Sequence, residues 1–108
     1  MVKPVAGEIV VVPFPRTDGG KRRPAFVIAD LPGADLILCQ ITSRAHFDGF
    51  AVTLDSSDFE RGQIDQPCYI RPQRIFTLEH HLILHSLGKV TEQKLDEVLK
   101  RAREFFVE

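Results

Sequence analysis

A cluster of cations stands directly before an apolar segment near the N-terminus. Between Arg16 and Arg23 the chain carries four Lys or Arg residues and one Asp, whereas its overall net charge is −1. An anion would therefore be attracted locally, since the chain as a whole has no basic excess. Lys21 and Arg22 fit either a solvated loop tip or general attraction of a phosphate chain. Arg23 precedes Pro24, which holds its backbone extended, and a planar guanidinium on a rigid support suits bidentate phosphate recognition.

Hydroxyl groups follow a second apolar segment. The stretch "ITSR" places Thr42 and Ser43 at the end of the apolar run Leu36–Ile41. Such residues commonly form turns, but a hydroxyl can also donate a hydrogen bond to a phosphate oxygen. If the segments on either side of the turn sequence "LPGAD" pair as neighbouring strands, Arg23 and Thr42 lie side by side. This pairing would create a site for a phosphate group.

Other patterns that carry chemistry are missing from the sequence. It contains no Gly-rich phosphate loop, no GxSxG and no HExxH, and its histidines have no metal-ligand spacing, so we expect no metal and no cofactor. Cys39 and Cys68 lie in apolar stretches without a CxxC pattern, which predicts buried, reduced thiols. The apolar run near the N-terminus is too short for a signal sequence or a membrane span. These features favour a cytoplasmic protein with no membrane partner.

Two hydrophobic periodicities predict the elements that position these residues. Short β-branched and apolar runs bounded by turn signals predict a series of strands. The strands are expected over Glu8–Pro13, Ala25–Ala29, Leu36–Ile41, Phe50–Leu54, Cys68–Arg71 and Arg74–Leu78, the last two being weakened by Pro67 and Pro72. An amphipathic spacing over Thr91–Phe106 predicts a helix with Thr91 as its N-cap and with Lys94 among its solvated charges. The length suits a single domain over residues 1–108, with a small antiparallel barrel over about 7–88 and a helix over about 91–106.

The chain resembles the MazF/PemK family of toxin–antitoxin ribonucleases. The resemblance covers Gly7–Phe106 and lies in "GEIVVVPFPRTDGGKRRPAFVI", "LILCQITSR", "CYIRPQRIFTLE" and "LGKVTEQKLDEVLKRAREFF". It implies a mainly β fold, an SH3-like barrel with a C-terminal helix, that acts as a homodimer. It also implies a metal-independent endoribonuclease that cuts single-stranded RNA at a short sequence. A small antitoxin, whose disordered tail lies over the active cleft, would silence it.

The resemblance also assigns roles to individual residues. Arg23 matches the family's catalytic arginine, and Thr42 matches its catalytic threonine. Arg71 matches a basic residue that some members use two positions before an aspartate. Gln73 stands at that second position and cannot act as a carboxylate base, and the histidine that some members use in the first loop is absent. Residues expected to bind RNA or support the site are Phe14, Thr17, Lys21, Arg22, Ser43, Arg44, His46, Arg71 and Gln73.

The chemistry expected of such a site needs no metal. The 2′-OH of RNA attacks the neighbouring phosphorus, so positioning supplies much of the acceleration, and DNA is not cut. Arg23 would stabilise the charge of the phosphorane, although a guanidinium cannot take up the proton. Thr42 would bind a phosphate oxygen or orient the 2′-OH. His46, four residues after Thr42, is either a general base or an uninvolved loop residue.

Two other functions are compatible with the sequence. A toxin with the same barrel could act without catalysis on a protein such as DNA gyrase, through C-terminal residues, and Arg23 and Thr42 would then have no role. A catalytically silent, RNA-binding or regulatory relative is the second alternative, which the missing histidine and aspartate favour. Cleavage of RNA in the presence of EDTA distinguishes the ribonuclease from both.

Overall fold

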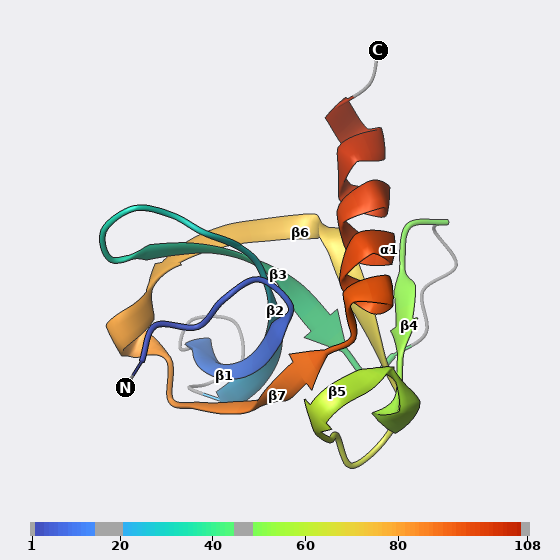
Figure 1. Cartoon of the computed structure of the whole chain (residues 1–108), viewed down its shortest axis with the longest axis horizontal. Helices are drawn as coiled ribbons and strands as arrows, with labels where there is room; N and C mark the ends of the chain where they lie inside the picture. The colour runs from blue at the N-terminus through green and yellow to red at the C-terminus, as the bar shows by residue number, and fades with distance from the viewer. Residues whose placement is uncertain (1, 15–20, 45–48, 107–108) are drawn as a thin grey trace.

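The computed structural model describes residues 2–14, 21–44 and 49–106, in which seven antiparallel strands curl into a half-barrel beside one C-terminal helix (Figure 1). The strands are β1 (Glu8–Phe14), β2 (Lys21–Asp30), β3 (Asp35–Thr42), β4 (Val52–Leu54), β5 (Phe59–Gly62), β6 (Cys68–Glu79) and β7 (His85–Val90). The helix is α1 (Glu92–Arg103), and short 3₁₀ turns occupy Ser56–Asp58, His80–Leu82 and Glu104–Phe106. The predicted mainly β barrel with a C-terminal helix is confirmed.

The strand order brings three strand ends together. Along the sheet the order is β4-β6-β3-β2-β1-β7-β5, so β3 lies between β2 and β6. Both neighbours run antiparallel to β3, and the first residues of β2 and β6 therefore lie beside the last residues of β3. Arg23, Thr42 and Arg71 consequently come to one end of the sheet.

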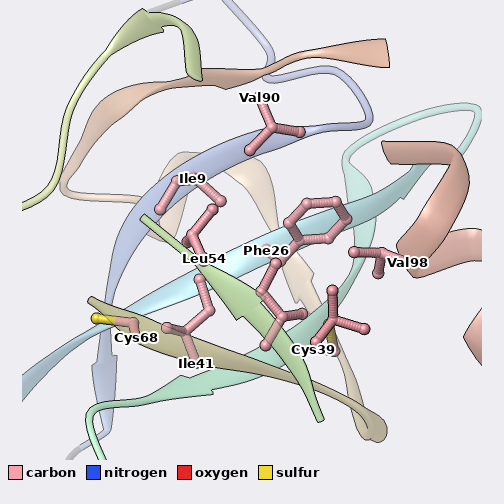
Figure 2. Close-up of a cluster of buried hydrophobic side chains, with 10 residues drawn as sticks. Ile9, Phe26, Cys39, Ile41, Leu54, Cys68, Val90 and Val98 are labelled. Carbon is pink, nitrogen blue, oxygen red and sulfur yellow. The ribbon is translucent and has the colours of Figure 1, made fainter. Parts of the chain in front are cut away.

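Alternation along the strands divides the buried side chains into two cores, one on each face of the curled sheet. The first core contains Phe26, Cys39 and Ile41 and meets Val98 of α1 (Figure 2). The second core contains Val10, Val12, Ala25, Val27, Leu36, Leu38 and Ile83. A side chain in a strand therefore projects toward the core that residues two positions away enter, and away from the core that its immediate neighbours enter. Both cysteines are buried free thiols, as predicted.

One long strand replaces two predicted ones. β6 continues through Pro72, where the sequence predicted an interruption. Against β3, Arg71 pairs with Gln40 and Ile75 pairs with Cys39, so the three residues between Arg71 and Ile75 bulge out of the ladder. A bulge tolerates proline because the unpaired residue has no hydrogen bond to donate. The prediction of two separate strands was wrong for this reason.

Two strands were not expected from the sequence. β5 reads FERG and β7 reads HSLGKV, and neither shows the apolar alternation that identifies a strand. They pair with each other, and β7 also pairs with β1. Long-range pairing rather than local pattern therefore forms them. β4 is also shorter than predicted, since it begins at Val52 rather than Phe50.

The C-terminal helix begins where the sequence predicted and ends earlier. The Thr91 hydroxyl accepts a hydrogen bond from the backbone N–H of Lys94 at 3.2 Å, as expected of an N-cap. Val98 and Ala102 are buried on the predicted apolar face. The 3₁₀ turn after Arg103 changes the period, so Phe106 is 76 % exposed instead of packed. Among the described residues, no helix has the length and apolar character needed to cross a membrane.

Lys94 is buried, although the sequence placed it on the solvated face of the helix. Its side chain is 9 % exposed, and its Nζ donates a hydrogen bond to the backbone carbonyl of Thr53 at 2.9 Å. The same ammonium lies 2.9 Å from a carboxylate oxygen of Glu97 and 3.6 Å from one of Asp58. Lys94 therefore ties α1 to β4 and to the turn that follows it, because its apolar stem can cross the contact between helix and strand.

Replacing Lys94 with alanine is expected to lower the free energy of unfolding by about 1–2 kcal/mol, because a buried carbonyl and a carboxylate lose their partner. The loss stays moderate because Glu97 is 48 % exposed and water can replace the lysine there. Urea denaturation measures the change. Lys100→Ala is the control, since this exposed lysine on the same helix should change stability by at most about 0.5 kcal/mol. Equal effects of the two substitutions would show that the contacts of Lys94 do not stabilise the fold.

Candidate functional site

The register of β2 against β3 sets the geometry at the strand ends. Ala25 pairs with Gln40, so the pairing predicted across the LPGAD turn is confirmed. Continued by two residues, this register places Arg23 opposite Thr42. On its other side Thr42 pairs with Tyr69 of β6. Extended in this way, the register puts Arg23, Thr42 and Tyr69 in one row across three strands, and the step from Arg23 to Thr42 lies just past the last ladder pair, Ala25 with Gln40.

These side chains project from a single face of the sheet. Ala25 enters the second core, and Arg23, two residues earlier in the same strand, projects to the same face. Gln40 and Arg71 pair with each other, and their neighbours in sequence enter the first core, so both project to this face as well. All five residues are partly buried. The strand-end cluster, as we name it, consists of Arg23, Gln40, Thr42, Tyr69 and Arg71.

The hydroxyl of Thr42 is oriented by its own chain. Its Oγ1 accepts a hydrogen bond from the backbone N–H of Arg44 at 3.2 Å, a turn that Thr commonly forms. A hydroxyl has a proton to donate in addition to its acceptor lone pairs. Thr42 can therefore donate a hydrogen bond to an oxygen of an anion bound beside Arg23.

Arg71 brings a second guanidinium to the strand-end cluster. It lies opposite Gln40, where the bulge of β6 begins. The Nε of Arg71 and the Oε1 of Gln73 are both shielded from solvent. The amide of Gln73 is neutral, so it can position a neighbouring group but cannot take up a proton as a carboxylate would. The cluster thus supplies two permanent positive charges and a hydroxyl, a set of groups suited to a phosphate.

A hollow of about 300 Å³ opens beside Arg23 at the same end of the sheet. We name it the cationic hollow, and it is lined by Lys21, Arg22, Arg23, Pro24, Ile41, Ser43, Gln66 and Cys68. The three consecutive cations belong to β2 and pair with Val12–Phe14 of β1. Of the two alternatives given for Lys21 and Arg22, the loop tip is corrected in one respect: strand pairing extends to both residues, so they are solvent-exposed strand positions rather than loop residues.

The structure separates two hydroxyls that are adjacent in the sequence. Ser43 lines the cationic hollow, whereas Thr42 projects from the face of the strand-end cluster. Arg23 belongs to both, since it stands in the row with Thr42 and also lines the hollow. A phosphate chain that passes Arg23 would meet Thr42 on one side of the sheet and Ser43 with Arg22 on the other.

Some predicted site residues lie outside the described part of the chain, and two residues of the strand-end cluster were not predicted. Thr17 and His46 fall outside the described residues, and only the backbone of Phe14 is described. Gln40 and Tyr69 were not predicted from the sequence. Each lies two residues before a predicted site residue in a strand, so alternation could have placed both on the same face.

Arg44 lies just past the end of β3 with an exposed side chain, so its cation is available to solvent or to a ligand. Within residues 2–14, 21–44 and 49–106, no group of three or more His, Cys, Asp or Glu side chains gathers in a way that could hold a metal ion.

Comparisons with known proteins give a family and a fold. A family model described as PemK-like, MazF-like toxin of type II toxin–antitoxin system matches residues 6–106. The crystal structure of MazE–MazF (Form-III) from Deinococcus radiodurans matches with a TM-score of 0.76 and 24 % identity over 95 % of each chain. MazF (Form-I) from the same organism matches with a TM-score of 0.76 and 23 % identity over 98 % of each chain.

A third similar structure is an endoribonuclease in complex with its cognate antitoxin from Mycobacterial species. Its TM-score is 0.69 at 19 % identity, over 94 % of this chain and 95 % of that one. No curated protein sequence matches the chain. At these identities the solved structures establish a shared fold.

Proposed function

The chain belongs to the family of PemK-like, MazF-like toxins of type II toxin–antitoxin systems, and from this premise we propose that it is a metal-independent endoribonuclease that cuts single-stranded RNA at a short sequence. The observation that carries the proposal is that Arg23 and Thr42 come to the same end of the neighbouring strands β2 and β3, beside a hollow lined by three cations. A fixed guanidinium and an oriented hydroxyl are the groups that a phosphodiester under attack requires. One structure of the same fold is described as an endoribonuclease.

Cleavage would proceed by attack of the 2′-oxygen on the adjacent phosphorus. The O2′–P bond forms while the P–O5′ bond breaks, which leaves a 2′,3′-cyclic phosphate and a 5′-hydroxyl. The proton of the 2′-OH ends on the leaving oxygen. Because the nucleophile is part of the substrate, holding it in line with the leaving oxygen supplies a large share of the rate. Side chains on rigid strands are suited to holding that geometry.

Arg23 and Thr42 act on the phosphate in this mechanism. The guanidinium of Arg23 donates two parallel hydrogen bonds to the non-bridging oxygens and stabilises the charge that develops on the phosphorane. Thr42, whose hydroxyl is held by the Arg44 N–H, donates to a phosphate oxygen or orients the 2′-OH. Arg71 adds positive charge beside them. Neither guanidinium can accept the 2′-OH proton, so we assign that transfer to no residue of the strand-end cluster.

Two protein partners belong to the proposal. A cognate antitoxin would silence the toxin by covering the strand-end cluster, and two of the similar structures are complexes of a toxin with its antitoxin. A second copy of the chain would form a homodimer. This is supported by large apolar side chains that are exposed in the single chain, namely Phe50, Ile75, Leu82, Leu84 and Phe106. An RNA substrate implies a cytoplasmic site of action.

Incubation of the purified protein with a long single-stranded RNA in EDTA tests the proposed function. We expect discrete fragments that end in a 2′,3′-cyclic phosphate, identified by mass spectrometry, and no cleavage of DNA of the same sequence. Arg23→Ala and Thr42→Ala should both abolish the fragments, while Thr42→Ser, which keeps the hydroxyl, should retain most of the cleavage. Intact RNA, or cleavage that survives Arg23→Ala, would overturn the proposal. Intact RNA from a protein that is still toxic would favour action on a protein target instead.

A further inference from the structure

A second, apolar hollow of about 200 Å³ adjoins the cationic hollow. The two share Pro24, Ile41, Gln66 and Cys68 as walls, so a single groove leads from the cations of β2 into the apolar space. The apolar hollow is completed by Ile9, Leu54, Gln63, Ile64, Asp65 and Leu87. Figure 2 shows Ile9, Ile41, Leu54 and Cys68 grouped on one side of the first core, with Val98 of α1 on the other.

We propose that the apolar hollow binds one unstacked nucleobase of the RNA, next to the phosphate held at Arg23, and that Asp65 and Gln66 read the edge of that base. The inference rests on the proposed function and names the part of the site that sets its sequence preference. The hollow is smaller than pockets for drug-sized ligands, which span about 300–1,000 Å³, and this size suits one flat ring. Single-stranded RNA is commonly recognised through bases that are splayed out and packed against side chains.

The walls of the hollow offer the ring an uncharged surface. Burial raises the pKa of the Cys68 thiol, so this side chain stays neutral at neutral pH. Ile41 and Leu54 are almost fully buried members of the first core, and they present their apolar surface to the hollow. A base face, which is apolar, is therefore favoured over a phosphate in this hollow, while the adjacent cations favour the phosphate.

The polar rim of the hollow is the segment Gln63–Gln66, whose backbone is held in place. The hydroxyl of Ser56 donates a hydrogen bond to the carbonyl of Ile64 at 3.2 Å. The thiol of Cys68 donates one to the carbonyl of Gln66 at 3.4 Å. A rim anchored in this way presents its side chains from fixed positions, as discrimination between bases requires.

The chemistry of the rim indicates which bases it accepts. Asp65 and Gln66 are exposed and line the hollow. A carboxylate only accepts hydrogen bonds, so Asp65 favours bases that carry an exocyclic amino group over uracil. The amide of Gln66 both donates and accepts, so it can complete the contact with the same edge. The negative charge of Asp65 also keeps phosphate out of this end of the groove.

Sequencing of the cleavage sites in a random-sequence RNA library tests the inference. The wild-type protein is expected to prefer an amino-bearing base at one position beside the cut. Asp65→Asn should reduce that preference about tenfold, with the cyclic phosphate ends unchanged. Asp96→Asn, an exposed carboxylate on α1, is the matched control and should leave the preference as it is. If Asp65→Asn and Gln66→Ala cut at the wild-type sequences, the inference is wrong and the proposed function stands.

A binding measurement separates the two possible failures because it needs no cleavage. Titration of methyl-labelled protein with cytidine 3′-monophosphate is expected to shift the methyl resonances of Ile41, Ile64 and Leu87, and Asp65→Asn should weaken this binding about tenfold. Methyl groups that respond to an antitoxin peptide but not to the nucleotide would overturn the inference. Shifts in a protein that leaves RNA intact would support the hollow's role and overturn only the proposed function.

Discussion

Arg23→Lys is expected to lower the rate constant of RNA cleavage about 10²–10³-fold, the scale of losing one preorganised donor to a developing charge. Lysine keeps the positive charge but lacks the planar fork that donates two parallel hydrogen bonds. Arg23 is partly buried in β2, paired with Val12 of β1 on one side. This fixed backbone cannot shift to compensate for a different head group. Single-turnover kinetics on a short RNA measure the loss, and urea denaturation checks that the fold is unchanged.

Arg22→Lys is the matched control for this substitution. It makes the same charge-conserving change one residue earlier in β2, on an exposed side chain that alternation sends to the opposite face. The rate should change by at most about fivefold, the scale of a solvent-exposed charge interaction. If Arg23→Lys also stays within that range, Arg23 contributes only charge, and the bidentate geometry proposed for it is wrong.

The positions of Arg23 and Thr42 could be predicted because they depend on local signals. Pro24 favours an extended backbone at Arg23, and the short LPGAD turn makes β3 the antiparallel neighbour of β2, so one hairpin decides both positions. β2 itself begins at Lys21, earlier than the predicted start after Pro24. The rest of the strand-end cluster depends on how β6 pairs with β3. That register is shifted by the bulge after Arg71, which no local pattern specifies. Alternation from Arg71 puts Tyr69 on the face of Arg71, but only the pairing of β6 with β3 puts it beside Thr42.

The burial of Lys94 and the strands β5 and β7 also could not be predicted from local sequence patterns. Helical periodicity describes the average polarity of a face, whereas Lys94 is buried because its ammonium contacts Thr53 of β4 and Asp58 of the turn that follows. β5 and β7 have weak strand patterns, and their pairing depends on glycines that allow two backbones to come close. Such contacts form only when the sheet is assembled. A substitution at the paired glycines of β5 and β7 tests them most directly.

Gly62→Ala is expected to lower the free energy of unfolding by about 2–5 kcal/mol, the sum of backbone strain and overpacking. Gly62 of β5 pairs with Gly88 of β7 and has a φ of +82°. A Cβ at Gly62 would lie 2.6 Å from the Cα of Gly88 and closer still to the carbonyl oxygen of Leu87. Both obstacles are backbone atoms of the ladder, so no side-chain rotation can relieve the clash. Urea denaturation measures the loss.

Gly33→Ala separates the two contributions. Gly33 has a φ of +84°, nearly that of Gly62, but a Cβ added there meets nothing within 4 Å. It should therefore cost only the strain, about 1–2 kcal/mol, and the difference between the variants measures the close approach. Because Gly62 directly precedes the rim Gln63–Gln66, Gly62→Ala should also alter the base preference of cleavage at a temperature where it stays folded, whereas Gly33→Ala should not. Equal destabilisation with unchanged preference would show that the approach of β5 to β7 does not position the rim.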